Sequence, residues 1–164
     1  MNIIYRKAEF QDIELLTETR LNLLKEDSGP ITENEKILLY QSNKEYMKNG
    51  MLHNSFFAFL AFDLSDSFSE NIFVGTCSAC LYAVLPGRKL PNGKHAYIQN
   101  TYVKPDYRGK GIAKKLVSFV IAEAMSMGYK DISLHATKMG QLLFKSCGFK
   151  EDINVGLTFM EYHA

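Results

Sequence analysis

The chain has 164 residues, a length typical of one domain, and it is 46% hydrophobic and 12% aromatic. A chain of this composition can bury a core without help from metals or disulfides. Its 19 lysine and arginine residues against 18 aspartate and glutamate residues give a formal net charge of +1. That balance argues against a protein that binds nucleic acid through a strong general field. We therefore expect a single domain over residues 1–164 and no nucleic-acid partner.

The sequence also argues against a membrane or secreted protein. No stretch approaches the roughly 20 apolar residues that span a bilayer. The N-terminal segment MNIIYRKAEFQD lacks the apolar core of a signal peptide. Three cysteines, an odd number, do not make a disulfide framework. We therefore expect a cytoplasmic protein with no membrane partner.

Alternating strand and helix patterns follow one another along the chain. Apolar residues at helical spacing after Asp12 predict a first helix, and Gly29 with its neighbours ends it. Thr32 and Glu35 have the spacing of a capping box, which predicts the start of a second helix. Runs of β-branched and aromatic residues predict the strands. The expected helices cover about 13–27, 32–50, 109–127 and 139–147, and the expected strands 1–7, 56–62, 72–85, 96–103, 131–136, 149–153 and 157–162. This order predicts a mixed α/β fold, with parallel strands around the helix at 109–127.

The segment Tyr102–Leu116 carries the most chemical information. A strand ends before Pro105, and a loop with Gly109 and Gly111 opens directly into an amphipathic helix. Glycines allow backbone N–H groups to approach a ligand, and the start of a helix supplies unpaired donors and a positive dipole end. Three cations add to this field: Arg108, Lys110 and Lys114. The loop therefore suits a phosphate or pyrophosphate, and the alternative is an ordinary solvated basic turn.

Two other phosphate motifs do not fit this loop. A P-loop needs four residues between its first glycine and Gly-Lys-Ser/Thr, and this spacing is missing. A dinucleotide fingerprint needs a third glycine where this chain has Lys114, and an acidic residue where it has His135-Ala136-Thr137. A nucleotide-binding oxidoreductase is therefore disfavoured.

The segment Arg108–Ala113 (RGKGIA) resembles the Arg/Gln-x-x-Gly-x-Gly/Ala signature of the GCN5-related N-acetyltransferase (GNAT) superfamily. The strand before it, the expected strand Ile132–Ala136 and the later Cys147–Phe149 segment also fit that family. The resemblance implies the acyl-CoA N-acyltransferase fold, a splayed central sheet with helices on both faces. It implies a transferase that moves the acetyl group of acetyl-CoA to a primary amine of a small molecule or peptide by direct attack. A non-catalytic acyl-CoA-binding sensor or partner module is the alternative.

The same resemblance suggests which residues bind acetyl-CoA. The pyrophosphate is expected on backbone N–H groups of the signature loop, and the pantetheine arm beside the preceding strand. An N–H group of that strand would polarise the thioester carbonyl. Thr137 aligns with an asparagine that contacts pantetheine in many relatives, and Phe144 is expected to pack against the arm. The full expected set is Tyr102, Val103, Arg108, Gly109, Lys110, Gly111, Ile112, Ala113, Thr137 and Phe144.

The groups that move protons are harder to assign. Many relatives place a proton-donating tyrosine where this chain has Phe144, and the strand 96–103 lacks the carboxylate that some use as a base. Catalytic candidates are Tyr97, Tyr102 and His135, although tyrosine is a poor base because its ordinary pKa is about 10. Histidine titrates near neutral pH, which suits a base, but a structural, partly buried histidine is the alternative. A water chain to solvent is a further option.

Other features indicate less. Cys77 and Cys80 are three residues apart on one expected strand and so point to opposite faces, which argues against a metal site. The acceptor pocket is expected around residues 26–32, 97–100 and 152–156. Its carboxylates would attract a cationic amine, whereas the basic segment 86–95 would instead attract an acidic group on the acceptor. An exposed edge in the final hairpin makes a homodimer possible.

Overall fold

The computed structural model describes residues 1–64 and 71–151. Its described strands form one sheet in chain order: β1 (Ile3–Lys7), β2 (Phe56–Asp63), β3 (Ile72–Ala83), β4 (Lys94–Val103) and β5 (Asp131–Ser133). Strands β1 to β4 pair antiparallel, whereas β4 and β5 pair parallel because a helix connects them. The expected mixed sheet is therefore confirmed.

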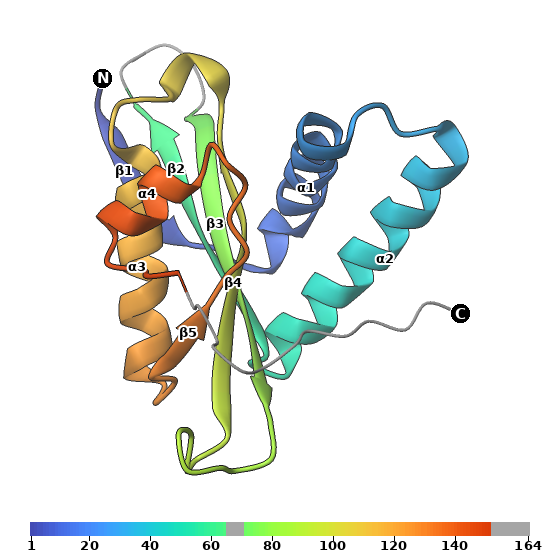
Figure 1. Ribbon diagram of the computed structural model, residues 1–164. Helices are drawn as coiled ribbons and strands as arrows, with labels where there is room; N and C mark the ends of the chain where they lie inside the picture. Colours follow the sequence, from blue (N-terminus) through green and yellow to red (C-terminus); the bar gives the residue numbers. More distant parts are fainter. Residues whose placement is uncertain (65–70, 152–164) are drawn as a thin grey trace.

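Helices cover both faces of the sheet (Figure 1). On one face lie α1 (Ile13–Ser28) and α2 (Glu33–Leu52), and on the other lie α3 (Ile112–Ser126) and α4 (Gln141–Ser146). Two separate apolar clusters result, since alternate strand residues point to opposite faces. The expected helix–sheet–helix arrangement is confirmed.

Cys77 and Cys80 belong to different clusters, one on each face of the sheet. The two thiols therefore cannot bind one metal together, as their spacing indicated. Burial raises the pKa of the Cys77 thiol to about 12. No group of three or more His, Cys, Asp or Glu residues with metal-binding geometry occurs in the described ranges.

Local contacts fix the first two helices. The 3-10 turn η1 (Phe10–Asp12) leads into α1, and the Asp12 carboxylate accepts hydrogen bonds from Arg6 at 2.6 and 2.7 Å, which tie α1 to β1. The expected capping box at α2 is present, since Thr32 Oγ1 accepts from Glu35 N at 3.3 Å and the Glu35 carboxylate accepts from Thr32 N at 2.8 Å. None of the helices described here has the length and apolar character that crossing a membrane requires.

Three expected boundaries were wrong or fall outside the described chain. The helix expected from Gly109 begins at Ile112, because Gly109 and Gly111 have φ values of +73° and +80°, which a right-handed helix does not allow. The strand expected to reach Ala136 ends at Ser133. Residues 149–151 form no strand, and the rest of the expected final hairpin, with its possible dimer edge, lies outside the described residues.

Candidate active site

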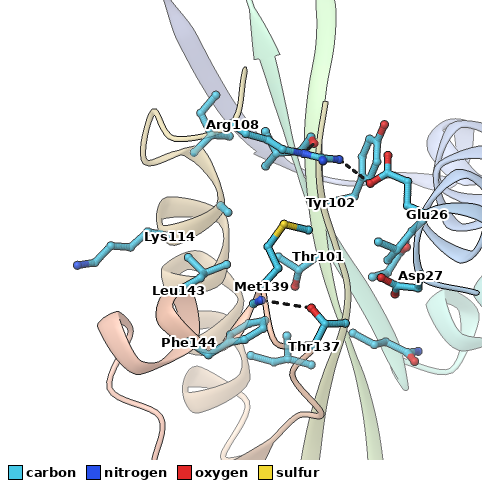
Figure 2. Close-up of a pocket in the computed structure, with 18 of the residues that line it drawn as sticks. Glu26, Asp27, Thr101, Tyr102, Arg108, Lys114, Thr137, Met139, Leu143 and Phe144 are labelled. Carbon is cyan, nitrogen blue, oxygen red and sulfur yellow. Dashed lines mark hydrogen bonds and ion pairs between the residues drawn. The ribbon is translucent and has the colours of Figure 1, made fainter. Parts of the chain in front are cut away.

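The sheet opens between β4 and β5. These strands pair only at three positions, the last being Tyr97 with Ser133, while β4 continues to Val103. From Ile98 onward the β5 side of β4 therefore has no strand partner within the described residues. The opening leads into a cavity of about 740 Å³ that is bounded by β4, α1, the start of α3 and the α4 region (Figure 2).

A β-bulge lies in β4 where it borders the cavity. Gln99 pairs with Ser78 and Tyr102 with Thr76, so that Asn100 and Thr101 together face one residue of β3. Asn100 has a φ of +54°, a conformation that asparagine adopts more readily than most residues. Such bulges redirect side chains, and both bulge residues line the cavity.

The loop before α3 presents free backbone donors to the same cavity. The first hydrogen bond within α3 runs from Lys115 N to Gly111 O at 3.1 Å, so the N–H groups of residues 112–114 have no intrahelical partner. No side chain of residues 1–64 or 71–151 caps this helix start. A Cβ added to Gly109 or Gly111 would meet no atom of these residues within 4 Å, so the backbone here is open to a ligand. These donors and the helix dipole suit an anion.

The three cations near the loop behave differently from one another. The Arg108 side chain donates to Val103 O at 2.8 Å and to the Glu26 carboxylate at 2.6 Å, and Arg108 N donates to Pro105 O in the 3-10 turn η2 (Pro105–Tyr107). The Lys110 ammonium donates to a backbone carbonyl at 2.8 Å and does not line the cavity. Lys114 points away from it in Figure 2. The free backbone donors therefore begin at Gly109, not at Arg108 as expected.

Two of the catalytic candidates contact each other at the cavity wall. The Tyr97 hydroxyl lies 2.6 Å from His135 Nδ1, and both residues line the cavity. His135 is exposed rather than partly buried, since β5 ends two residues before it. The pair thus connects the cavity with solvent through an imidazole ring.

Tyr102, the third candidate, is 9% exposed and also lines the cavity. Burial raises the pKa of its hydroxyl, the Glu26 carboxylate raises it further, and the Arg108 charge opposes this shift. The phenol therefore stays protonated at neutral pH. This makes Tyr102 a poor base but a suitable proton donor.

Thr137 and Phe144 lie on the opposite wall from α1 (Figure 2). Thr137 Oγ1 accepts from Gly140 N at 3.2 Å, which fixes the turn before α4. Phe144 is buried and packs edge-on against Phe149, with ring centroids 5.9 Å apart. The usual tyrosine position is thus filled by an apolar ring that has no proton to donate.

The α1 wall holds two residues expected at the acceptor pocket and one that was not expected there. Glu26 and Asp27 belong to the last turn of α1, and both face the cavity (Figure 2). Arg20 also lines the cavity, and no motif signalled it. The basic segment 86–95 connects the far ends of β3 and β4, where Lys94 donates to Met127 O, so it does not border the cavity.

A sheet that opens beside a glycine loop and a free helix start has the geometry that suits an extended anionic ligand. Residues 23–149 match the model of the acetyltransferase (GNAT) family, and the chain belongs to this family.

Similar proteins agree with this assignment. The structure resembles that of a predicted acetyltransferase with acetyl-CoA from Clostridium acetobutylicum, at 26% identity, a TM-score of 0.80 and 99% coverage of both chains. It shares its fold with a GCN5-related N-acetyltransferase from Ralstonia eutropha JMP134, at 21% identity, a TM-score of 0.77 and coverage of 96% and 99%. A curated relative, the thialysine N-epsilon-acetyltransferase of Bos taurus, is 32% identical over 62 residues. That match spans 36% of each chain, so the alignment covers about a third of the relative's length.

Proposed function

We propose that this chain is an N-acetyltransferase that moves the acetyl group of acetyl-CoA to a primary amine of a small molecule or peptide. The observation that carries the proposal is the open edge of β4, which leads directly to the free N–H groups at the start of α3. Two of the similar proteins support it: one was solved with acetyl-CoA, and the other is named for acetylation of an Nε amine.

The residues present fit acetyl-CoA. Backbone N–H groups from Gly109 to Lys114 would hold the pyrophosphate. A Cβ at Gly109 or Gly111 would meet no described atom within 4 Å, and the N–H groups of residues 112–114 lack helical partners. The backbone of β4 at Tyr102 and Val103 would pair with the pantetheine arm, while Thr137 and Phe144 would line the arm from the other wall. Bound in this way, acetyl-CoA supplies an activated thioester.

The chain's own groups would then handle the protons. An ammonium must lose a proton before its nitrogen attacks the thioester carbon, and the Tyr97–His135 pair offers a route for that proton to solvent. A C–N bond forms, the C–S bond breaks, and the departing sulfur gains a proton. Tyr102 suits this donation because its hydroxyl stays protonated at neutral pH, whereas Phe144 has no proton to give.

Calorimetric titration with acetyl-CoA, followed by a thiol-release assay over a panel of amines, tests the proposal. We expect saturable binding, amine-dependent release of free coenzyme A, and loss of both in Gly111→Trp, whose side chain would enter the cavity. Binding without turnover on any amine would favour the non-catalytic acyl-CoA-binding module. No binding by the folded protein would refute both.

A further inference from the structure

Arg20 is a cation without a partner in the described part of the chain. It is half-buried, it lines the cavity from α1, and no hydrogen bond or ion pair joins it to another described residue. Arg108, on the same cavity, is instead neutralised by Glu26 at 2.6 Å. A half-buried guanidinium that faces a cavity favours an anionic group as its partner.

Arg20 lines the cavity from α1, the helix that packs on the same face of the sheet as Cys80. Burial raises the pKa of the Cys80 thiol, and the Arg20 charge is one of the influences that lower it, which places the guanidinium within electrostatic range of β3. Cys80 also accepts a hydrogen bond from Gln99 Nε2 at 2.7 Å, and Gln99 lines the cavity with Arg20. The positive charge of Arg20 therefore borders the same cavity as Gln99, the residue before the bulge.

Asn100 in that bulge is a second group without partners. The residue is only 4% exposed, and neither Nδ2 nor Oδ1 of its side chain has a hydrogen-bond partner among the described residues. Leaving buried polar atoms unpaired is unfavourable because they lose their hydrogen bonds to water, so native structures rarely keep such atoms without a ligand or water. The residue lines the same cavity as Arg20, and its carboxamide can accept from an amine while donating to another group.

We propose that Arg20 and Asn100 form the acceptor site, and that the acceptor carries a carboxylate or phosphate beside its amine. Arg20 binds the anionic group, and Asn100 Oδ1 accepts a hydrogen bond from the amine. This inference rests on the proposed N-acetyltransferase function and specifies its substrate class.

The charges around the site agree with such an acceptor. Asp27 lies seven residues after Arg20 on α1, about 10 Å along the helix axis at 1.5 Å per residue. The α1 wall of the cavity therefore presents a cation and, two turns away, a carboxylate, which suits an acceptor that carries both charges. Glu26 does not compete for Arg20, because Arg108 already holds its carboxylate.

Matched amines that differ only in the anionic group test the proposal. Lysine is compared with cadaverine, which lacks the carboxylate, and O-phosphoethanolamine with ethanolamine, so that the two pairs separate a carboxylate from a phosphate. We expect kcat/KM to be at least 10-fold higher for the anionic member of one pair. A lysine with both ends blocked as amides stands in for a peptide acceptor and is expected to behave like cadaverine.

Variants of Arg20 then locate the anion site. Arg20→Gln is expected to raise the KM of the anionic acceptor roughly 10- to 100-fold, as loss of a charge-assisted pair does, with unchanged affinity for acetyl-CoA. Arg20→Lys keeps the charge and should restore part of the loss. Arg88→Gln, an exposed arginine in the β3–β4 connection, is the matched control and should change nothing.

Asn100 variants separate a binding role from a structural one. Asn100→Gly keeps the positive φ and removes the unpaired carboxamide, so it should raise the acceptor KM at least 10-fold while the melting temperature holds or rises. Asn100→Asp retains an acceptor oxygen and should preserve more activity than Asn100→Gly. A merely structural Asn100 would leave the acceptor KM unchanged in both variants.

The outcomes distinguish this inference from the function on which it rests. Turnover that is equal within each amine pair, or that Arg20→Gln leaves intact, refutes the anionic acceptor while the acetyltransferase stands. Better turnover of the blocked lysine than of free lysine would also refute it, in favour of a peptide acceptor. Binding of acetyl-CoA without turnover of any amine would remove the proposed function and the inference together.

Discussion

We predict that a single methyl group added at Gly111 weakens the binding of acetyl-CoA by the loop before α3. Gly111 and Gly148 both have positive φ, at +80° and +94°, and a Cβ at either position meets no atom of the described part of the chain within 4 Å. Alanine at each should therefore cost a similar amount, about 1–2 kcal/mol for a left-handed conformation. At about 2–4 °C per kcal/mol for a domain of this size, both melting temperatures should fall by about 2–8 °C. Gly111 lines the cavity and Gly148 does not, so Gly148→Ala is a control with similar backbone strain.

The two variants should differ when acetyl-CoA is added. At a ligand concentration 100 times Kd, the wild type and Gly148→Ala should gain about 2.7 kcal/mol of stability. We expect the Cβ of Gly111→Ala to weaken binding at least 10-fold, which removes about 1.4 kcal/mol of that gain. Thermal melts with and without acetyl-CoA measure both effects. Equal protection of the two alanine variants would refute the assignment of the pyrophosphate to this loop.

Three further predictions concern catalysis and stability. Phe144→Tyr, which restores the proton donor common in the family, should raise kcat about 10-fold or more in steady-state assays; an unchanged or lower kcat would mean that position 144 does not reach the leaving sulfur. Tyr97→Phe and His135→Ala should each lower kcat about 10- to 100-fold. The double variant should be no worse than either single variant, because the two side chains act through one hydrogen bond. A double variant whose loss of kcat is the product of the two single losses would contradict a shared proton route. Burial raises the pKa of the Asp12 carboxyl, whereas the hydrogen bonds from Arg6 and from the backbone lower it. The net result is a lowered pKa. The pair should therefore stabilise the fold above pH 4, where the unfolded carboxyl ionises, and lose this contribution as pH falls through the folded pKa. Asp12→Asn should lower the free energy of unfolding by about 1–3 kcal/mol at pH 7, measured by urea unfolding, and should reduce the loss of stability at acid pH. If the variant loses as much stability at acid pH as the wild type, the Arg6–Asp12 pair is not the source of that loss.

Structural features that depend on residues close in sequence could be predicted from the sequence. The Thr32–Glu35 capping box depends on a three-residue spacing, and the structure forms it. The glycine loop before α3 also follows from local chemistry, although the helix starts later than expected because two left-handed glycines precede it. The family signature lies in this same local segment, which explains why the fold could be predicted.

Structural features that depend on contacts between residues far apart in sequence could not be predicted. Where β5 ends depends on how far it follows β4, and the residues after Ser133 show no change of pattern that would indicate this. The partner of Arg108 is Glu26, 82 residues away, so its charge could not be assigned from the loop alone. Arg20 lies in an amphipathic helix, where a lone arginine is indistinguishable from a solvated one until the cavity is seen.

The central claim is that acetyl-CoA lies along the open edge of β4, with its pyrophosphate at the start of α3. Amide resonances of the 15N-labelled protein, followed during titration with acetyl-CoA, test this most directly. We expect saturable shifts confined to residues 98–103 and 109–114 and to the cavity walls around them, with amides of the β3–β4 connection unmoved. Shifts that saturate elsewhere while the glycine loop stays unchanged would contradict it.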